Sequence, residues 1–349
     1  MKNIKVIIWG FGAMGKGMAE MLLTKKGVTI VGVCDVNPRI VDKSIFEVLS
    51  IKSHHEHVFI TSDIDVLLEN KQADVVLLCT DSFVKGAFGK IMKVVSHKIN
   101  CISTAEEMAY PYANAPELAK EIHKHAKANG VTVLGTGINP GFIMDLLVVA
   151  LSGTMKDVKH IEANRVNSLS PFGPAVMHEQ GVGISLDEYN DRVEKNELSG
   201  HVGFKESVEM IADAMGVKLD GFKQQMKPIV TSVDRKSPYG EAKKGTLAGI
   251  NMTGQGLIKG KVFIDMKHPQ QIEPEMEGTH TGDYINLEGT PNIHMAINPE
   301  IDGGIGTIAM CVNMIPHVMN AKPGLKTMID LPVPRAILGD MRDLIEQDE

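Results

Sequence analysis

Short apolar runs rich in valine and isoleucine alternate with longer amphipathic stretches through the first 135 residues of the chain. Parallel strands that are buried on both faces, and the helices that cover them, have this appearance in sequence, because such strands lack a polar face. The pattern predicts strands at residues 4–9, 29–34, 57–60, 74–79, 100–103 and 131–134. We therefore expect an α/β domain built on a doubly wound parallel sheet.

Two of the intervening stretches carry helix signals. Residues 37–50 begin with Asn37, a good N-cap, followed by proline at the first helical position. Residues 114–130 repeat this scheme, with Asn114 or Ala115 at the N-cap and Pro116 at the first helical position, and end in Gly130, which suits the left-handed position after a helix. A third helix is expected from Ala13, where apolar residues recur every three or four positions.

The sequence changes character after Gly135. Up to about residue 300 it is richer in glycine, proline and short alternating segments, such as "KHIEANRVNS", "GQGLIKGKVFIDMKH" and "GDYINLEGT", which predict a mainly antiparallel sheet. The tail begins with an apolar helical run that we expect to return to the first sheet, and it closes in proline-punctuated coil. The predicted domains are 1–138, completed by 303–349, and an α+β domain at 139–302.

Composition and charge exclude several classes of partner. The 349 residues are 43% hydrophobic and 23% charged, which is typical of a globular protein large enough for two domains. A formal net charge of -7 gives no broad basic field for a polyphosphate backbone, so we expect no nucleic-acid partner. No stretch reaches the roughly 18 apolar residues of a membrane span, so we expect no membrane partner and a cytoplasmic protein.

Cysteine and histidine spacings give no support for a disulfide framework or a metal site. The four cysteines are far apart, and no C-x-x-C spacing is present. The sequence "HHEH" at 54–57 lies in a polar stretch without a second ligand group at a helical or finger spacing. We expect a solvated loop there and no metal.

A glycine motif directly follows the first predicted strand and opens the first helix. Gly10 permits a tight turn, Gly12 lets the backbone approach a pyrophosphate, and Gly15 allows close packing of helix on strand. The second strand ends in Asp35, twenty residues beyond Gly15, where a carboxylate can accept hydrogen bonds from ribose hydroxyls. These features predict a Rossmann domain that binds NAD or NADP.

Asp35 favours NAD, because its charge would face the 2′-phosphate of NADP. Arg39 is either a solvent-facing residue or a contact for that phosphate, so use of both cofactors stays open. The residues predicted to contact the dinucleotide lie in the glycine motif and at the ends of later strands. They are Gly10, Phe11, Gly12, Ala13, Met14, Gly15, Asp35, Arg39, Thr80, Asp81, Ser82, Thr104, Ala105, Asn139 and Pro140.

Three polar residues, Thr80, Asp81 and Ser82, follow the fourth predicted strand. Open parallel sheets bind ligands at the carboxyl ends of their strands, so we expect these residues on the nicotinamide side of the site. An alternative for Asp81 is that it caps the next helix.

The fifth strand delivers "STAEEM", with Glu106 and Glu107, to the same edge. Sugar dehydrogenases often place Glu-Lys-Pro here, where the lysine handles an alcohol proton, but this chain has no lysine at that point. A carboxylate is suited to standing beside a protonated amine or iminium and activating the water that attacks it. The motif therefore predicts oxidative deamination; the alternative is that both glutamates cap the following segment in solvent.

The second domain supplies candidate substrate contacts. Arg165 in "ANRVNSLSPFGPAVMHEQ" suits an amino-acid carboxylate, although a salt bridge inside the domain is an equal alternative. Phe142 in "GINPGFIMD" is pocket wall or core, and "EGTHTGDY" adds His280 and Asp283 as wall residues. The predicted substrate-binding residues are Phe142, Arg165, Asn167, Ser168, His178, Gln180 and His280.

Taken together, "WGFGAMGKGMA", "STAEEM", "GINPGFIMD" and "ANRVNSLSPFGPAVMHEQ" resemble the 2,4-diaminopentanoate dehydrogenase family of anaerobic ornithine fermentation. The resemblance implies NAD(P)-dependent oxidation of the 4-amino group of 2,4-diaminopentanoate to 2-amino-4-oxopentanoate and ammonia. It also implies a homodimer formed through the second domain. A glutamate after the fifth strand is the acid/base in such enzymes; here that is Glu106 or Glu107, and Glu106 comes first after the strand.

Other functions stay open at this point. A dihydrodipicolinate reductase would share the first domain, but its His-His pair followed by lysine and its Ser-Gly-Thr run are not seen. An alcohol or aldehyde dehydrogenase needs a proton donor or a cysteine in the crevice, and Cys79 and Cys101 are expected inside strands. A dehydrogenase of another amine or amino acid would share the whole pattern, whereas a non-catalytic nucleotide sensor needs no polar pocket in its second domain.

Overall fold

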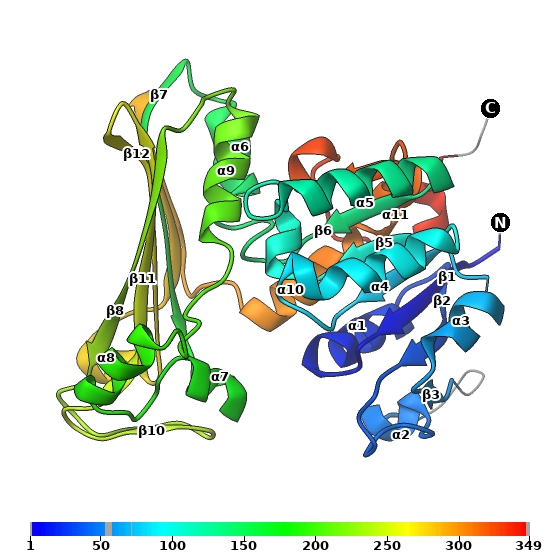
Figure 1. Cartoon of the computed structure of the whole chain (residues 1–349), viewed down its shortest axis with the longest axis horizontal. Coiled ribbons are helices and arrows are strands. Elements are labelled where there is room, and N and C mark those ends of the chain that lie inside the picture. The colour runs from blue at the N-terminus through cyan, green and yellow to red at the C-terminus, as the bar shows by residue number, and fades with distance from the viewer. Residues whose placement is uncertain (1, 53–57, 71, 347–349) are drawn as a thin grey trace. The chain divides into compact units, whose positions relative to one another are not determined.

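The computed structural model describes residues 2–52, 58–70 and 72–346. The "HHEH" cluster and the start of the strand predicted at 57–60 lie outside these residues. The chain divides into two compact units (Figure 1). Unit 1 comprises Met1–Phe142 and Asp302–Glu349, and unit 2 comprises Ile143–Ile301.

Unit 1 is built on a seven-stranded sheet in the order β15-β6-β5-β4-β1-β2-β3. Every neighbouring pair of these strands is parallel. The strand order reverses between β1 and β4, which makes the carboxyl ends of these two strands the topological switch point. The predicted doubly wound sheet is therefore confirmed. Its strands are β1 (Ile4–Trp9), β2 (Val28–Cys34), β3 (Ile60–Thr61), β4 (Val75–Leu78), β5 (Asn100–Ser103), β6 (Thr132–Gly135) and β15 (Gly324–Lys326).

Helices of unit 1 cover this sheet (Figure 1). The central strands have almost no exposed side chain, as in Val6, Ile7 and Ile8 of β1 at 0%. Each such burial contributes roughly 1.5–3 kcal/mol relative to exposure. The helices and 3-10 turns are α1 (Ala13–Leu23), α2 (Ile45–Leu49), α3 (Ile64–Asn70), α4 (Val84–Ser96), η1 (Glu106–Ala109), α5 (Pro116–Asn129), α10 (Gly303–Asn313), α11 (Ile315–Asn320), η3 (Met328–Asp330) and η4 (Met341–Leu344).

The helix predicted at 37–50 is wrong in its first half. The side chain of Asn37 accepts the Arg39 N–H at 3.0 Å, which makes a turn instead of a helix start. Helix α2 begins later, after Ser44, whose hydroxyl accepts the Phe46 N–H at 3.3 Å. Asparagine and serine form the same local bonds in turns and in caps, so the sequence did not distinguish the two starts.

The C-terminal segment completes unit 1. The coil predicted near the end of the chain is wrong for Gly324–Lys326, which pairs with Thr132–Leu134 of β6 as a further parallel strand. Helix α10 packs on α1, because Gly17 has no side chain: a Cβ there would lie 2.2 Å from Cδ1 of Ile308.

Unit 2 is built on a six-stranded sheet in the order β14-β13-β7-β12-β11-β8. Its neighbouring strands are antiparallel except for the parallel pair β7 and β12. The predicted mainly antiparallel second sheet is confirmed. The strands are β7 (Asp157–Ser168), β8 (Gly221–Val230), β11 (Leu247–Ile258), β12 (Lys261–Gln271), β13 (Gly282–Thr290) and β14 (Ile293–Ile297), with a separate hairpin of β9 (Arg235–Lys236) and β10 (Glu241–Ala242). The other elements are α6 (Leu146–Ser152), α7 (Pro174–Glu179), α8 (Leu186–Glu194), α9 (Phe204–Ala214) and η2 (Pro274–Glu277).

The two faces of the unit 2 sheet differ in burial. Along β7, Ala163 and Arg165 on one face are buried, whereas Glu162 and Asn164 on the other are half-buried. Helix α9 covers the buried face, and Phe204 packs closely there because Gly254 of β11 leaves room for it.

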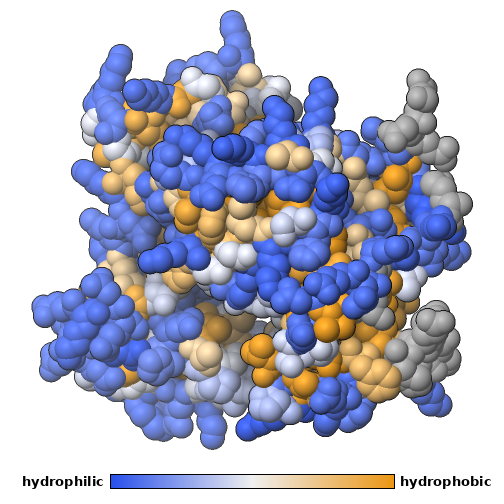
Figure 2. All heavy atoms as spheres, turned by 45° about the vertical axis from the view of Figure 1, so that its right-hand side comes forward, coloured by the Kyte–Doolittle hydropathy of each residue, from blue (hydrophilic) through white to orange (hydrophobic). Residues whose placement is uncertain are grey.

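Within the described residues, no helix combines the length and the apolar character needed to cross a membrane. On the face of the molecule in Figure 2, hydrophilic side chains predominate and hydrophobic areas lie between them.

Candidate active site

The glycine turn after β1 has the geometry that a pyrophosphate-binding turn needs. Gly10 has a φ of +96°, and a Cβ there would lie 2.7 Å from the carbonyl oxygen of Cys79. A Cβ on Gly15 would lie 2.0 Å from the Gly10 carbonyl oxygen, so α1 packs directly on the turn. By contrast, a Cβ on Gly12 meets nothing within 4 Å. Open space therefore lies over Gly12, where a ligand can approach the backbone.

Asp35 connects the end of β2 to this turn. Its Oδ2 accepts the Phe11 N–H at 2.5 Å, and its Oδ1 accepts the Asn37 N–H at 2.8 Å. The carboxylate is half-buried at the position expected for a ribose contact, while the side chain of Arg39 is exposed. The side chain of Phe11 is 1% exposed, so a dinucleotide can reach only the backbone of that residue.

The two remaining residues of the motif lie at the start of α1. Ala13 is exposed, and Met14 is half-buried. The side chain of Met14 lies close to Gly304 of α10: a Cβ added to Gly304 would be 3.5 Å from the Met14 Cε. The C-terminal segment therefore adjoins this side of the turn.

The loop after β4 contains an ion pair that the sequence did not reveal. Thr80 Oγ1 donates to Asp81 Oδ2 at 2.5 Å, and Lys90 Nζ of α4 donates to the same two oxygens at 2.9 and 2.7 Å. Phe83 is the N-cap of α4, so the suggestion that Asp81 caps this helix is wrong. No short-range motif links Lys90 to Asp81, because the contact depends on how α4 folds back over the loop.

The adjacent acids at the end of β5 have different surroundings. Both are half-buried, and Glu106 is the first residue of η1. Glu107 Oε2 accepts the Val84 N–H at the start of α4 at 2.8 Å. The suggestion that both acids cap the following segment is therefore wrong for Glu107, which caps an earlier helix. Thr104 and Ala105, which precede Glu106, are half-buried and buried.

The turn after β6 brings Asn139 and Pro140 to the same edge of the sheet. Gly141 has a φ of +128°, and a Cβ there would lie 2.5 Å from the Gly137 nitrogen, so the turn closes tightly. Asn139 is half-buried and Pro140 is buried. Half-buried Phe142 is the last residue of the first segment of unit 1.

These loops meet because all strands of the unit 1 sheet are parallel, so their carboxyl ends share one edge. The edge combines an open glycine turn, the half-buried carboxylate of Asp35 and an acid on η1. It can hold a dinucleotide and place a proton-accepting group beside it.

In unit 2, Arg165 forms the internal salt bridge that was one of its two predicted roles. Its Nη1 lies 2.5 Å from Asp283 Oδ1, and its Nη2 donates to the Ile301 carbonyl. Arg165 is 2% exposed and Asp283 is 1% exposed. The charge of Arg165 is therefore matched within the unit, and Asp283 is an ion-pair partner instead of a pocket wall.

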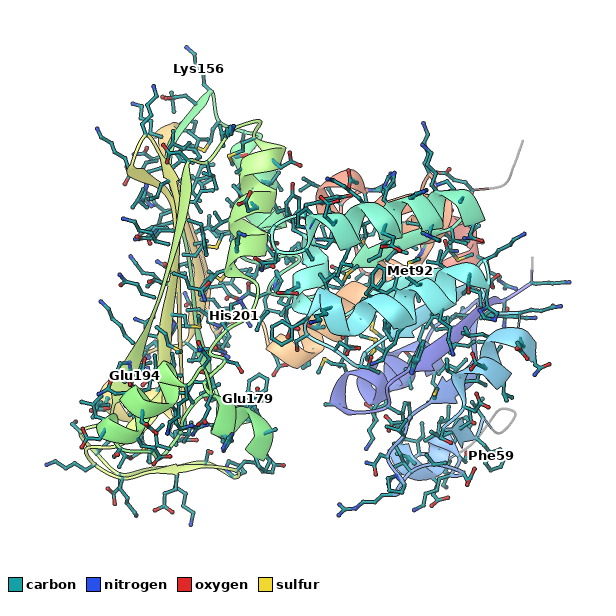
Figure 3. The ribbon with its side chains drawn as sticks, viewed as in Figure 1. Phe59, Met92, Lys156, Glu179, Glu194 and His201 are labelled. Carbon is teal, nitrogen blue, oxygen red and sulfur yellow. The ribbon has the colours of Figure 1, made fainter. Side chains whose placement is uncertain are left out.

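Close to this pair, a polar row lies on the helix-covered face of the sheet, with three of its residues buried and His201 and Gln270 half-buried. We use this name for Asn167, Gln180, His201, His268 and Gln270. Asn167 Oδ1 lies 2.9 Å from His268 Nε2, and Gln180 Nε2 donates to Gln270 Oε1 at 3.2 Å. The rings of His201 and His268 meet edge to face, with centroids 4.6 Å apart. His201, labelled in Figure 3, lies in the segment before α9.

Two polar atoms of the row lack a protein partner. Gln180 Oε1 and His201 Nε2 are buried, and neither has a hydrogen bond within the part of the chain that the structure describes. Burial, and secondarily the charge of Arg165, lowers the pKa of His201 to about 3. Burial likewise holds the pKa of His268 well below its usual value. Both imidazoles are therefore neutral at physiological pH, and the row offers neutral acceptors and donors to a ligand.

The other predicted substrate residues lie elsewhere in unit 2. Ser168 is on the opposite face of β7 from Asn167, because side chains alternate along a strand. His178 is exposed on α7, with a ring nitrogen 3.4 Å from Arg192 Nη2, and His280 is also exposed. The structure thus brings Asn167 and Gln180 into the row but not these three residues.

Three residues of the polar row, His201, His268 and Gln270, are not among those that the sequence predicted. His268 and Gln270 continue the inward alternation of Ile264 and Met266 along β12, so a period of two could have identified them as inward-facing polar residues. His201 lies in a segment without regular structure, and no comparable sequence signal marks it.

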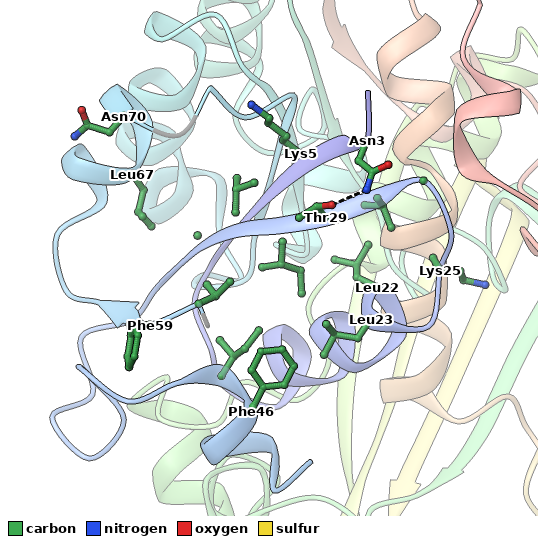
Figure 4. A pocket seen from close by; sticks show the side chains of 17 residues that line it. Asn3, Lys5, Leu22, Leu23, Lys25, Thr29, Phe46, Phe59, Leu67 and Asn70 are labelled. Atoms are coloured by element: carbon green, nitrogen blue, oxygen red, sulfur yellow. Dashed lines mark hydrogen bonds between the residues drawn. The ribbon is translucent and has the colours of Figure 1, made fainter. Parts of the chain in front are cut away.

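A cavity of about 710 Å³ lies elsewhere in unit 1, beside β2 (Figure 4). Leu22, Phe46 and Leu67 contribute apolar walls, and none of the predicted site residues lines it. Within the described residues, no group of three or more histidine, cysteine, aspartate or glutamate side chains is arranged to hold a metal ion.

Comparison with known proteins matches both parts of the chain. A family model for the 2,4-diaminopentanoate dehydrogenase C-terminal domain matches residues 142–347, and one for the dihydrodipicolinate reductase N-terminus matches residues 4–104. The chain is 59% identical to 2,4-diaminopentanoate dehydrogenase of Acetoanaerobium sticklandii, over 100% of this chain and 99% of that protein. It is 24% identical to an amine dehydrogenase of Streptomyces virginiae, over 96% and 98%.

Among solved structures, an amine dehydrogenase from Mycobacterium smegmatis superposes with a TM-score of 0.85 at 23% identity. The match covers 97% of this chain and 98% of that one, so the two share the fold throughout.

Proposed function

The chain belongs to the 2,4-diaminopentanoate dehydrogenase family, and we propose that it deaminates 2,4-diaminopentanoate oxidatively at C4. The products are 2-amino-4-oxopentanoate, ammonia and reduced NAD or NADP. Identity of 59% over the full length to a protein of that name carries the proposal. The open glycine turn and the acid of η1 on one sheet edge provide the parts that the reaction needs.

The cofactor fits the residues of unit 1. The backbone at Gly12 and the start of α1 would hold the pyrophosphate, because free N–H groups at a helix start attract phosphate. Asp35 would accept hydrogen bonds from the ribose hydroxyls, and its negative charge favours NAD over NADP. When bound, the nicotinamide supplies a hydride acceptor.

We assign the proton transfers to Glu106. Loss of hydride from C4 leaves an iminium carbon, and Glu106 removes a proton from the water that attacks it. The same carboxyl group then returns a proton to nitrogen, which departs as ammonia while the C4 carbonyl forms and the proton of the C4 hydroxyl is released to solvent. One residue can serve both steps because it starts and ends the cycle as a carboxylate.

Within unit 2, we propose that the polar row is suited to binding an amino-acid group. Such a group is a zwitterion with no net charge, and the row is neutral because both imidazoles are uncharged and Arg165 is paired with Asp283. Gln180 Oε1 offers a buried acceptor for the 2-ammonium group. Unpaired buried acceptors discriminate strongly against ligands that lack the matching donor. We therefore expect kcat/KM to be lower for 4-aminopentanoate, which lacks the 2-ammonium group, than for 2,4-diaminopentanoate. Equal values of kcat/KM would contradict this role.

The function is tested by the absorbance of the reduced cofactor with 2,4-diaminopentanoate, other diamino acids and hydroxy acids. Glu106→Gln is expected to lower kcat by about 10²–10⁴-fold and to leave cofactor affinity unchanged. Unchanged turnover would remove Glu106 as the base. Absence of signal with every amine would favour a nucleotide sensor.

We further propose a cytoplasmic homodimer that acts in ornithine fermentation, as the family resemblance implies. Sedimentation should then give a mass twice the 38.0 kDa of one chain. A single-chain mass at micromolar concentration would contradict the dimer.

A further inference from the structure

Glu106 and Glu107 are neighbours in sequence, but the structure gives Glu107 a specific set of partners. Its Oε2 accepts the Val84 N–H at 2.8 Å, and its Oε1 lies 3.5 Å from Asn114 Nδ2. Its own backbone N–H donates to the Ser82 carbonyl at 3.1 Å. Glu107 therefore holds the loop before α4 through both its backbone and its side chain.

Helix α4 depends on this remote contact at its first residue. The N-cap, Phe83, has no side-chain oxygen that can accept a helix N–H. A carboxylate at this place satisfies an otherwise unpaired donor and interacts favourably with the positive end of the helix. Moving the Glu107 carboxylate towards a substrate would leave the Val84 N–H without this acceptor.

The contact also fixes η1. On its other side, η1 packs against β6, where a Cβ on Gly135 would lie 2.1 Å from the Met108 carbonyl oxygen. The turn that carries Glu106 is thus held between the start of α4 and the end of β6. The loop at Thr80–Ser82 is joined to the same turn through the Ser82 carbonyl.

We propose that Glu107 is a positioning residue that clamps η1, and with it Glu106, to the start of α4 and exchanges no proton with the substrate. The proposal rests on the proposed function only in the catalytic role that it gives to Glu106. The clamp itself concerns bonds within unit 1.

The test compares Glu107→Gln, Glu107→Ala and Glu106→Gln in the full chain. Three quantities are measured: kcat with its pH profile, cofactor affinity from the fluorescence of Trp9, and hydrogen exchange of the Val84 amide. Trp9 is the one tryptophan of the chain and directly precedes Gly10. Glutamine keeps an oxygen that can accept the Val84 N–H, whereas alanine removes it.

We expect Glu107→Ala to speed exchange at Val84, weaken cofactor binding and lower kcat by about tenfold or more, because a misplaced acid/base loses rate steeply. Glu107→Gln should restore exchange protection and keep kcat within roughly fivefold of the wild type, with the same pH profile, because a neutral acceptor is about half as strong as a charged one. Glu106→Gln should abolish most turnover and leave Val84 protected.

Two results would overturn the proposal. One is that Glu107→Gln is as inactive as Glu106→Gln while the Val84 amide stays protected, which would show that Glu107 takes part in the chemistry. Alternatively, Glu107→Ala could leave exchange and kcat unchanged, which would show that no clamp exists. Hydrogen exchange and cofactor affinity can be measured without turnover. If the protein is inactive on 2,4-diaminopentanoate, the proposed function is refuted, but these two measurements still test whether Glu107 clamps η1.

Discussion

The carboxylate of Asp35 has two tasks at the scale of a single residue. It accepts backbone N–H groups from Phe11 and Asn37, which fixes the glycine turn, and we propose that it also selects the cofactor. The sequence located this acid from its distance to Gly15, because strand, turn and helix lengths are nearly constant in a dinucleotide-binding unit. It did not show that the carboxylate holds the turn.

Asp35→Asn should raise the NADP to NAD ratio of kcat/KM by about tenfold or more, because removal of one charge close to a phosphate is worth at least 1.4 kcal/mol. Asparagine preserves the shape of the side chain but keeps only one acceptor oxygen. Asp42→Asn is the matched control, because Asp42 is exposed and has a φ of +64° that asparagine tolerates. An unchanged ratio in Asp35→Asn would exclude Asp35 as the selecting group.

At the scale of elements, the β9–β10 hairpin is anchored by a buried arginine. Arg235 is 2% exposed, donates to Gln271 Oε1 at 2.7 Å and to the Ile272 carbonyl at 2.9 Å, and pairs with Glu277. Hydrogen bonds from Ser232, and then the pairing with Arg235, lower the pKa of Glu277 to about 2 from 4.5.

This shift predicts how stability depends on pH. A carboxyl group with a lower pKa in the folded state stabilises the fold fully above pH 4.5, and that stabilisation is lost as pH falls towards about 2. Glu277→Gln should therefore be less stable than the wild type at pH 7, and the difference should shrink between pH 4.5 and 2. Urea unfolding of both proteins at several pH values measures it. A difference that stays constant over this range would contradict the assignment.

Element prediction succeeded where the pattern of burial is simple. The strands Ile4–Trp9 and Asn100–Ser103 appear with their predicted bounds, because continuous apolar runs fit central parallel strands. The start of the helix at 37–50 failed, because Asn37 forms a local turn that competes with a cap. Strand β15 was missed because three residues after a proline are too few to show a period.

At the scale of the whole molecule, each unit has apolar cores of its own. One large cluster of buried residues runs from Ile7 to Leu325 entirely within unit 1, and another, which includes Leu169 and Ile272, lies within unit 2. Damage to one unit is therefore expected to leave ligand binding by the other largely intact.

Arg165→Met tests this independence. Removal of the guanidinium leaves the buried Asp283 carboxylate without its charged partner and should destabilise unit 2 by about 3–5 kcal/mol. Trp9 lies in unit 1, so the cofactor affinity measured by its fluorescence should stay unchanged. Far-UV circular dichroism should show an unfolding transition at a lower urea concentration than in the wild type. The double variant Arg165→Met/Asp283→Leu should recover part of the loss. If the cofactor affinity falls together with the free energy of unfolding, the two units unfold together.

The sequence alone determined the doubly wound sheet, the dinucleotide turn and the presence of acid after the fifth strand. Each of these depends on local spacing or on the period of burial, which are written along the chain. Tertiary structure decided which partner each polar group has. Asp81 pairs with Lys90, Arg165 with Asp283 and Glu107 with the start of α4, and each pairing depends on how separate elements of the chain pack together. The chemistry of a charged side chain follows from that partner, because a group held in an ion pair or a helix cap is committed to the fold.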